Sequence, residues 1–278
     1  MAIVSAVIAP HGSQVIEGAA AADATAAARV TTAGMEELGR HVAASGADTA
    51  IVFTPHNVHV EGAMAVIESG RIEGALEGGT KKVALDVPVE RELAADVKQA
   101  VRSAGVPVVG LSYGGNDAAS AAFPMDWAVF VPLWFLGGRQ LPPIPTVVMC
   151  PARDLDAETH VRAGRAVADA ARRSGRRIVI VASCDQGHRH LESGPYGYAP
   201  DAAAFDDQMA DIVRSGDLRR LLDIDPAFVS RAAADSWWQS LLLHGALGDG
   251  WRSELISYEH PTYFGMLCAA FSPATDSA

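Results

Sequence analysis

The chain has 278 residues, of which 49% are hydrophobic, and it carries a formal net charge of −11. This length fits one large domain or two small ones, and the apolar content supports a substantial core. The acidic excess argues against a nucleic-acid partner, because phosphate binding needs a basic surface. No apolar run approaches the roughly 18 residues of a membrane span, and no basic segment precedes the first apolar run.

The cysteines are consistent with a reducing compartment. Cys150, Cys184 and Cys268 are odd in number and widely spaced. They fit reduced thiols better than a disulfide framework or a zinc cluster. We therefore expect a cytoplasmic protein that has neither a signal peptide nor a membrane span.

Short apolar runs alternate with helical segments along most of the chain. Residues 19–45 are rich in alanine, the best helix former, and Met35, Leu38 and Val42 recur there at helical spacing. Residues 125–136 are strongly apolar, but Pro132 limits them to a short helix or a bent strand. The expected strands are 3–8, 50–53, 63–67, 81–85, 106–111, 146–149, 176–182 and 255–258. The expected helices are 19–45, as one long helix or two, and 90–103, 156–173, 201–215, 218–222, 226–231 and 235–247.

This alternation predicts an α/β fold with a central, mixed β-sheet that is flanked by helices. No internal repeat or low-complexity linker interrupts it. The polar tail, residues 271–278, is expected to be disordered.

Three of the expected strands end near a histidine. The first strand leads into Pro10 and His11, the second leads into Pro55 and His56, and the run 179–190 reaches His188 after a small-residue turn. A proline restrains its own backbone and the residue before it, so the imidazole that follows points in a fairly fixed direction. Because strand-end loops carry the chemistry of α/β proteins, these histidines predict one shared site.

Two neutral histidines and a carboxylate form the facial triad of non-haem Fe(II) oxygenases. His11 and His56 are the candidate histidines, and Glu259 at the end of the last expected strand is the candidate carboxylate. One histidine at a strand end is usually structural, but three together with a glutamate make that reading weaker. The metal is not defined by this residue set, since zinc uses the same ligands.

His188 differs from the other two because it follows the flexible turn 185–187. A histidine titrates near neutrality and suits general acid–base work. The alternatives are a fourth metal ligand or a loop histidine bonded to backbone. His190 has the same chemistry in principle. His59 lies on the opposite face of an extended segment from His56, so only His56 is favoured as a ligand.

Other side chains are weaker candidates. Trp127 is by residue type more often core than a platform for substrate. Arg139, Arg153 and Arg189 are the arginines able to bind a substrate carboxylate, although loop arginines are usually solvated. A serine hydrolase is disfavoured, because the Gly-x-Ser-x-Gly motif is missing.

The order of these motifs resembles the class III extradiol dioxygenases, which are typified by the catalytic subunit of protocatechuate 4,5-dioxygenase and by 2-aminophenol 1,6-dioxygenase. The resemblance spans roughly residues 3–266. Each motif is short, and their combination is more specific than any one of them. The motifs are Ala9-Pro10-His11-Gly12, Thr54-Pro55-His56, Ser183-Cys184-Asp185-Gln186-Gly187-His188-Arg189, Pro195-Tyr196-Gly197-Tyr198, Ala204-Phe205-Asp206 and Tyr258-Glu259-His260-Pro261.

The resemblance implies a single catalytic α/β domain over residues 1–270. It also implies Fe(II) held by His11, His56 and Glu259, with His188 as the acid–base residue. The implied reaction inserts both atoms of O2 into an aromatic ring beside a vicinal diol or an aminophenol. Trp127, His59, His190 and Tyr198 are the substrate-binding candidates.

One departure concerns Trp127, which stands where many members have a histidine in an Asp-His-Gly motif. An indole N–H only donates and cannot exchange a proton at neutral pH. The departure favours a 2-aminophenol or a bulky catechol slightly.

Two other functions remain open from the sequence. A zinc-dependent hydrolase would use the same ligands, and a catalytically silent relative would act as a binding or partner subunit. Trp237 and Trp238 in an apolar helix indicate a homodimer, a higher homo-oligomer or a small partner subunit.

Overall fold

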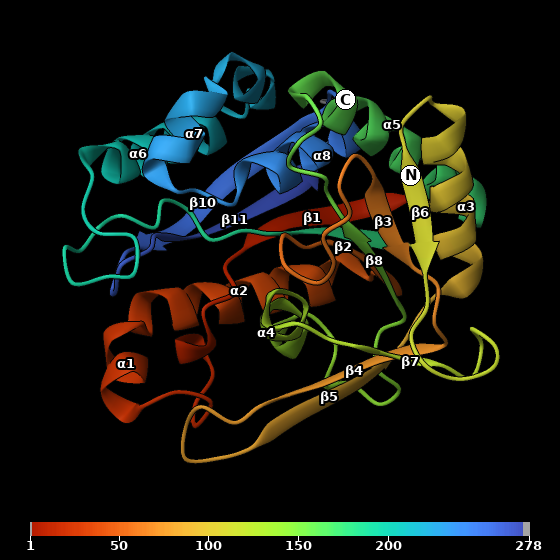
Figure 1. The fold of residues 1–278 in the computed structure, drawn as a ribbon, viewed down its shortest axis with the longest axis horizontal. Coiled ribbons are helices and arrows are strands. Elements are labelled where there is room, and N and C mark those ends of the chain that lie inside the picture. Colours follow the sequence, from red (N-terminus) through yellow and green to blue (C-terminus); the bar gives the residue numbers. More distant parts are fainter. Residues whose placement is uncertain (1, 275–278) are drawn as a thin grey trace.

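The middle layer of the molecule is a mixed, eight-stranded β-sheet (Figure 1). It is seen in a computed structural model that describes residues 2–274. Across the sheet the strands are β10 (Trp251–Glu259), β11 (Met266–Pro273), β1 (Ile3–Ala9), β9 (Ile178–Ser183), β2 (Thr49–Phe53), β8 (Thr146–Cys150), β3 (Met64–Ile67) and β6 (Val108–Leu111).

The four central strands β1, β9, β2 and β8 are parallel, so their carboxyl ends share one edge of the sheet. Strand β11 runs antiparallel to β1, and the edge strand β10 runs antiparallel to β11. The central strands are buried along almost their whole length, which is why they read as continuous apolar runs.

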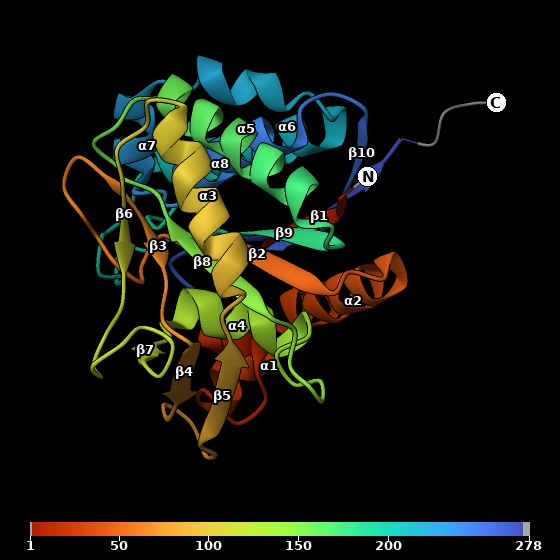
Figure 2. The ribbon, with the colours of Figure 1, turned by 90° about the vertical axis from the view of Figure 1, so that its right-hand side faces the viewer.

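Helices cover both faces of this sheet (Figures 1 and 2). One face carries α3 (Arg91–Ser103), α5 (Ala157–Ser174), α6 (Pro200–Ser215), α7 (Pro226–Ala232) and α8 (Trp237–Leu247). The other face carries α1 (Ala22–Ala27), α2 (Arg29–Ser45) and α4 (Trp127–Phe135). Below α4 lies a second, three-stranded sheet of β5 (Val83–Pro88), β4 (Arg71–Leu76) and β7 (Ala122–Pro124), and two short 3-10 helices are η1 (Ser13–Val15) and η2 (Leu218–Asp223).

Glycines let α5 and α8 approach closely. A methyl group on Gly164 would clash with the carbonyl oxygen of Leu242, and one on Gly245 would clash with that of Val161. Trp237, at the start of α8, donates its indole N–H to the carbonyl of Leu221 at 2.9 Å. These contacts fix the position of α8, and with it the segment just before the helix.

The predicted α/β fold with a central mixed sheet is confirmed. Three strands that the sequence did not reveal are β4, β7 and β11. Because β11 continues to Pro273, where it pairs with Trp251, the expectation of disorder was wrong for residues 271–273. The rest of that expectation, residues 275–278, lies outside the described residues.

The apolar segment around Pro132 is a helix, and the long alanine-rich segment is two helices, α1 and α2. The three cysteines are free and buried. Among residues 2–274, no helix has the length and apolar character needed to span a bilayer.

Candidate metal centre

The carboxyl ends of β1 and β2 bring His11 and His56 together. Their imidazole rings are perpendicular, with centroids 5.0 Å apart. His11 is fully buried, whereas about a quarter of the His56 side chain is exposed. The prediction that these two strand-end histidines share a site is therefore correct in its geometry.

The third member of the group is Asp235, which immediately precedes α8. Its Oδ2 lies 3.2 Å from Nε2 of His56 and 3.5 Å from Nε2 of His11. Atoms bound to one ion at about 2.0–2.1 Å stand roughly 3–3.5 Å from one another. The three side chains are the one group of potential ligands in the described part of the chain whose donor atoms all lie within 4.8 Å of one another.

Two members of this group have buried donor atoms without a hydrogen bond, although Oδ2 of Asp185 lies 3.3 Å from Nε2 of His11. Nε2 of His11 and both carboxylate oxygens of Asp235 are buried and accept or donate no hydrogen bond. Buried polar atoms are nearly always paired, because leaving them unpaired costs about 1–3 kcal/mol each. A cation between them would satisfy all three atoms, so the residues fit a metal ion.

A hydrogen-bonded chain orients His11 toward this point. The Ser183 hydroxyl donates to the carbonyl of Ala128 at 2.5 Å, so its oxygen is left to accept from Nδ1 of His11 at 3.0 Å. With Nδ1 carrying a proton, Nε2 is the nitrogen that offers a lone pair to a metal. The carboxylate of Asp185 also accepts from the backbone N–H of His11 at 3.0 Å.

Negative charge dominates the electrostatics of the centre. Burial alone would lower the pKa of His11, but the carboxylates of Asp185 and Asp235 outweigh it and raise this pKa to about 9. Burial would raise the pKa of Asp235, yet His11 and His56 hold it below its ordinary value. The negative potential that favours a proton on His11 would also favour a divalent cation bound to the imidazole in place of that proton.

Glu259 is not part of this group, which corrects the ligand set expected from the sequence. Its Oε1 accepts hydrogen bonds from the backbone N–H and the hydroxyl of Thr31, both at 2.7 Å. Strand β10, which ends at Glu259, is the edge strand and lies four strands from β2. Because adjacent strands are about 4.8 Å apart, Glu259 lies too far from His56 across the sheet to share a metal ion with it.

Sequence reasoning missed Asp235 because an aspartate before a helix is usually an N-cap. Here it does not cap, since the N-cap of α8 is Ser236, and no side chain caps this helix. A local sequence pattern cannot distinguish these two roles.

The loop after β9 presents His188. Nδ1 of His188 lies 2.8 Å from the carbonyl oxygen of Gln186, which can only accept, so Nδ1 holds the proton of the neutral ring. The backbone N–H of His188 donates to the carbonyl of Ala232 at 2.9 Å. Just before it, the N–H of Gly187 donates to the buried carboxylate of Asp206 at 2.7 Å. Nε2 of His188 is left free as a base.

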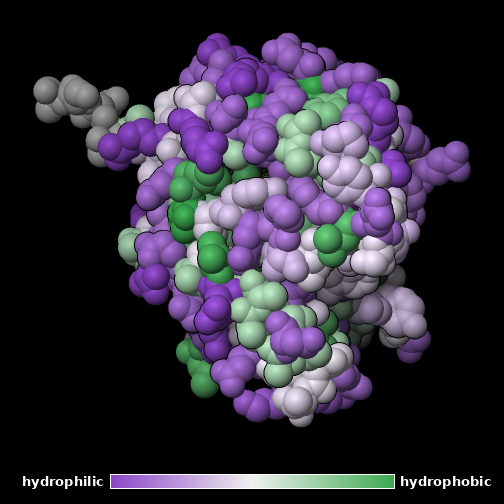
Figure 3. All heavy atoms as spheres, turned by 90° about the vertical axis from the view of Figure 1, so that its left-hand side faces the viewer, coloured by the Kyte–Doolittle hydropathy of each residue, from purple (hydrophilic) through white to green (hydrophobic). Residues whose placement is uncertain are grey.

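A cavity of about 500 Å³ contains His11, His56 and His188 in its lining. Trp127 also lines it and stacks on His56, with ring centroids 4.6 Å apart. Tyr196, Tyr263 and Phe264 form an aromatic wall around His188. From the side on which the loop 184–199 lies, the surface is mostly hydrophilic, and apolar side chains form small separate patches (Figure 3).

Three residues expected to bind substrate lie outside this lining. His59 is exposed, and Tyr198 is 56% exposed on the loop beyond His188. Nε2 of His190 donates to the carboxylate of Asp206 at 2.8 Å, and its ring stacks on that of His260. Their role in substrate binding stays a prediction that the cavity geometry does not support.

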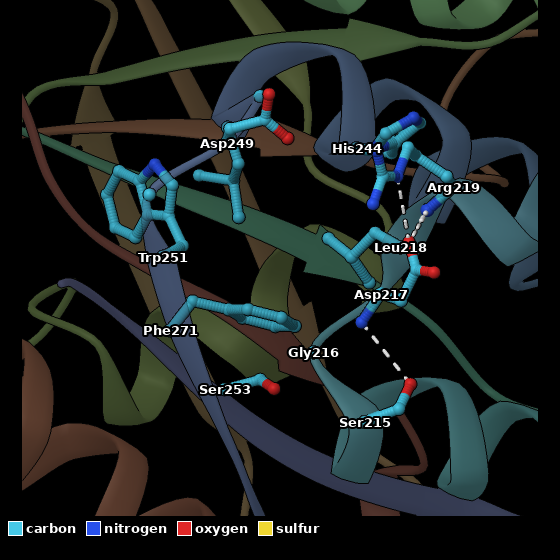
Figure 4. A pocket seen from close by; sticks show the side chains of 13 residues that line it. Ser215, Gly216, Asp217, Leu218, Arg219, His244, Asp249, Trp251, Ser253 and Phe271 are labelled. Atoms are coloured by element: carbon cyan, nitrogen blue, oxygen red, sulfur yellow. Dashed lines mark hydrogen bonds and ion pairs between the residues drawn. The ribbon is translucent and has the colours of Figure 1, made fainter.

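A second cavity, of about 260 Å³, lies at the opposite edge of the sheet, near the start of β10 (Figure 4). Asp217, Arg219, His244 and Trp251 are among its lining residues, and Arg219 pairs with Asp217. It contains none of the grouped donor atoms. Of these two cavities, only the one with His188 is lined by members of the donor group, His11 and His56.

Comparisons with known proteins identify the family of the chain. A family model described as the catalytic LigB subunit of aromatic ring-opening dioxygenase matches residues 5–269. Protein CA_C1420 of Clostridium acetobutylicum is 25% identical over 231 residues, which are 82% of this chain and 49% of that protein. The chain thus spans about half the length of this curated relative.

The fold has a counterpart among solved structures. The crystal structure of the uncharacterized protein JW3007 from Escherichia coli K12 matches with a TM-score of 0.62 at 17% sequence identity. The match covers 96% of this chain and 99% of that one. At this identity the likeness shows the fold alone.

Proposed function

The chain belongs to the family of the catalytic LigB subunit of aromatic ring-opening dioxygenases, and from this we propose that it opens a catechol or 2-aminophenol ring with O2 at Fe(II). His11, His56 and Asp235 would hold the iron. The observation that carries the proposal is the set of buried donor atoms without partners at the cavity that His188 and Trp127 also line.

Held by His11, His56 and Asp235, Fe(II) would supply the activation of O2 and of the two adjacent heteroatoms of the substrate. The protein must therefore orient its ligands, admit a flat ring and move protons. Ser183 supports the first task by fixing the ring of His11 through Nδ1. The aromatic residues of the cavity support the second, because rings stack favourably on rings.

Proton transfer falls to His188 in this proposal. Nδ1 is held by the carbonyl of Gln186, so Nε2 accepts the proton of the substrate hydroxyl and can return it later. Trp127 stands where a second histidine is common in the family, and its indole cannot exchange protons. His188 would consequently carry this step alone.

The test is to purify the protein without oxygen, measure its metal, and record O2 uptake with a series of catechols and 2-aminophenols. Stoichiometric iron with uptake and a ring-opened chromophore supports the proposal. Zinc without O2 uptake would favour the metal-dependent hydrolase instead. Absence of bound metal after reconstitution would favour a catalytically silent relative.

A further inference from the structure

We infer that the substrate of this cavity carries a neutral or cationic substituent, preferably an alkylammonium group, and not a carboxylate. This inference rests on the proposed ring-opening function and concerns the same cavity. The observations that carry it are the absence of arginine and lysine from the lining among residues 2–274, the acids that are there, and the aromatic wall around His188.

Apart from three histidines, one of which pairs with Asp185, the charged side chains of the lining are acidic. Within residues 2–274, the lining includes the carboxylates of Asp185 and Glu77 but no arginine or lysine. Asp185 is buried, whereas Glu77 is exposed and pairs with Lys82 at 2.6 Å. A carboxylate on the substrate side chain would lose hydration in such a cavity without gaining an arginine or lysine partner, which is costly. The net charge of −11 acts in the same direction over longer range.

The arginines named as carboxylate binders from the sequence are engaged elsewhere. Arg189 donates to the backbone carbonyls of Tyr196 and Arg231 at 3.0 and 3.3 Å. The guanidinium of Arg153 lies 4.9 Å above the ring of Trp238.

Arg139 is engaged in the same way. Its guanidinium donates to the backbone carbonyl of Trp134 at 2.7 Å and lies over the indole ring of the same residue. None of the three arginines lines the cavity, so none is placed to meet a substrate carboxylate.

The aromatic wall suits a cation. Phe264 stacks on His188 with centroids 5.3 Å apart, and Tyr196 and Tyr263 lie 5.8 and 5.9 Å from it. Tyr196 is 54% exposed, so part of its ring is free to contact a ligand. An ammonium over such a ring gains about 0.5–2 kcal/mol, which a carboxylate in the same place does not.

Three catechols with the same ring and nearly the same side chain test the inference. They are 2-(3,4-dihydroxyphenyl)ethylamine, the neutral 4-ethylcatechol and 3-(3,4-dihydroxyphenyl)propionate. Binding is measured by calorimetry on the metal-loaded protein without oxygen, so that nothing is turned over. We expect the amine to bind roughly tenfold more tightly than the acid, with the neutral compound between them. Equal or tighter binding of the acid would overturn the inference.

Substitutions in the lining show which side chains cause the preference for the amine. Tyr196→Leu should reduce the preference for the amine several-fold, whereas Tyr196→Phe, which keeps the ring, should leave it unchanged. Leu76→Arg would add a cation to the lining and should raise the affinity for the acid. Arg219→Gln, in the cavity at the opposite edge of the sheet, is the matched control and should change none of the three affinities. Identical preferences in all variants would contradict the role of the wall.

The outcome separates this inference from the proposed function. If the amine binds best but no ring is opened by the iron-loaded protein, the proposed function fails and the preference stands. If rings are opened and the acid is the best substrate, the preference alone fails.

Discussion

Two buried aspartates, Asp235 and Asp206, show what distinguishes a reactive carboxylate from a structural one in this molecule. Asp206 is 1% exposed and accepts three hydrogen bonds, from the N–H of Gly187, from Nε2 of His190 and from the hydroxyl of Tyr258. Asp235 is 4% exposed and accepts none. The two carboxylates are therefore similarly buried, but only that of Asp206 is hydrogen-bonded.

The difference indicates what each carboxylate does. A buried carboxylate that accepts hydrogen bonds from several protein donors needs no further partner. Its hydrogen bonds stabilise the loop that carries those donors. A buried acid that faces only two imidazoles is balanced either by a proton on one of them or by a cation bound in place of that proton. The same contrast separates Glu259, which Thr31 satisfies, from Asp235.

The largest expected effect comes from Asp235→Asn, which should remove the metal. An amide is a poor ligand for iron or zinc, so we expect metal affinity to fall by at least roughly 100-fold. Metal content after dialysis is the measurement, with the melting temperature recorded with and without added metal. The matched control is Glu259→Gln, which should keep the metal. If Glu259→Gln lost the metal and Asp235→Asn kept it, Glu259 would be the ligand, and the hydrogen bonding of a buried carboxylate would not indicate its role.

The next largest effect concerns His188 and His190, which lie on the same loop. His188→Gln should retain the metal and lose roughly 10²–10⁴-fold in turnover, as expected for removal of a general acid–base group. His190 pairs with Asp206 and does not line the cavity, so His190→Gln should change turnover by only a few-fold. Equal losses in both variants would show that the loop as a whole, and not one imidazole, supports the reaction.

Asp206→Ala should act on stability. It removes the acceptor of three buried donors, which should lower the free energy of unfolding by about 3 kcal/mol. The variant should still bind metal below its melting temperature, because no donor atom of the centre is altered. Chemical unfolding and metal content measured on the same sample test both statements. Loss of metal without loss of stability would show that Asp206 belongs to the centre.

The histidines of this site were predictable because their positions depend on local sequence. A proline and a histidine directly follow β1 and β2, and parallel strands place such residues on one edge. Asp235 was not predictable in that way. Its place depends on α8, whose position is set by contacts such as Gly164 against Leu242, far away in the sequence.

Strand β11 was missed for a related reason. Its central residues, Cys268, Ala269 and Ala270, have small side chains that seldom mark a strand, and its pairing with β1 joins opposite ends of the chain. The alternation of strands and helices gave the α/β class correctly. It could not give the strand order that separates Glu259 from His56.

The smallest effect is expected for Tyr258→Phe, which removes one of the three donors to Asp206. Burial, together with Asp206, raises the pKa of Tyr258 above its ordinary value, so its hydroxyl stays a donor at every pH at which the protein is folded. One lost hydrogen bond to a carboxylate should cost about 1–2 kcal/mol in unfolding free energy and leave metal content and turnover unchanged. Two donors would remain on Asp206, so the loss should be well below that of Asp206→Ala. Because both substitutions act on the same carboxylate, the double variant Tyr258→Phe with Asp206→Ala should be no less stable than Asp206→Ala alone. A fully additive loss would mean that Tyr258 stabilises the fold independently of Asp206, and the account of Asp206 as a carboxylate satisfied by its neighbours would then fail.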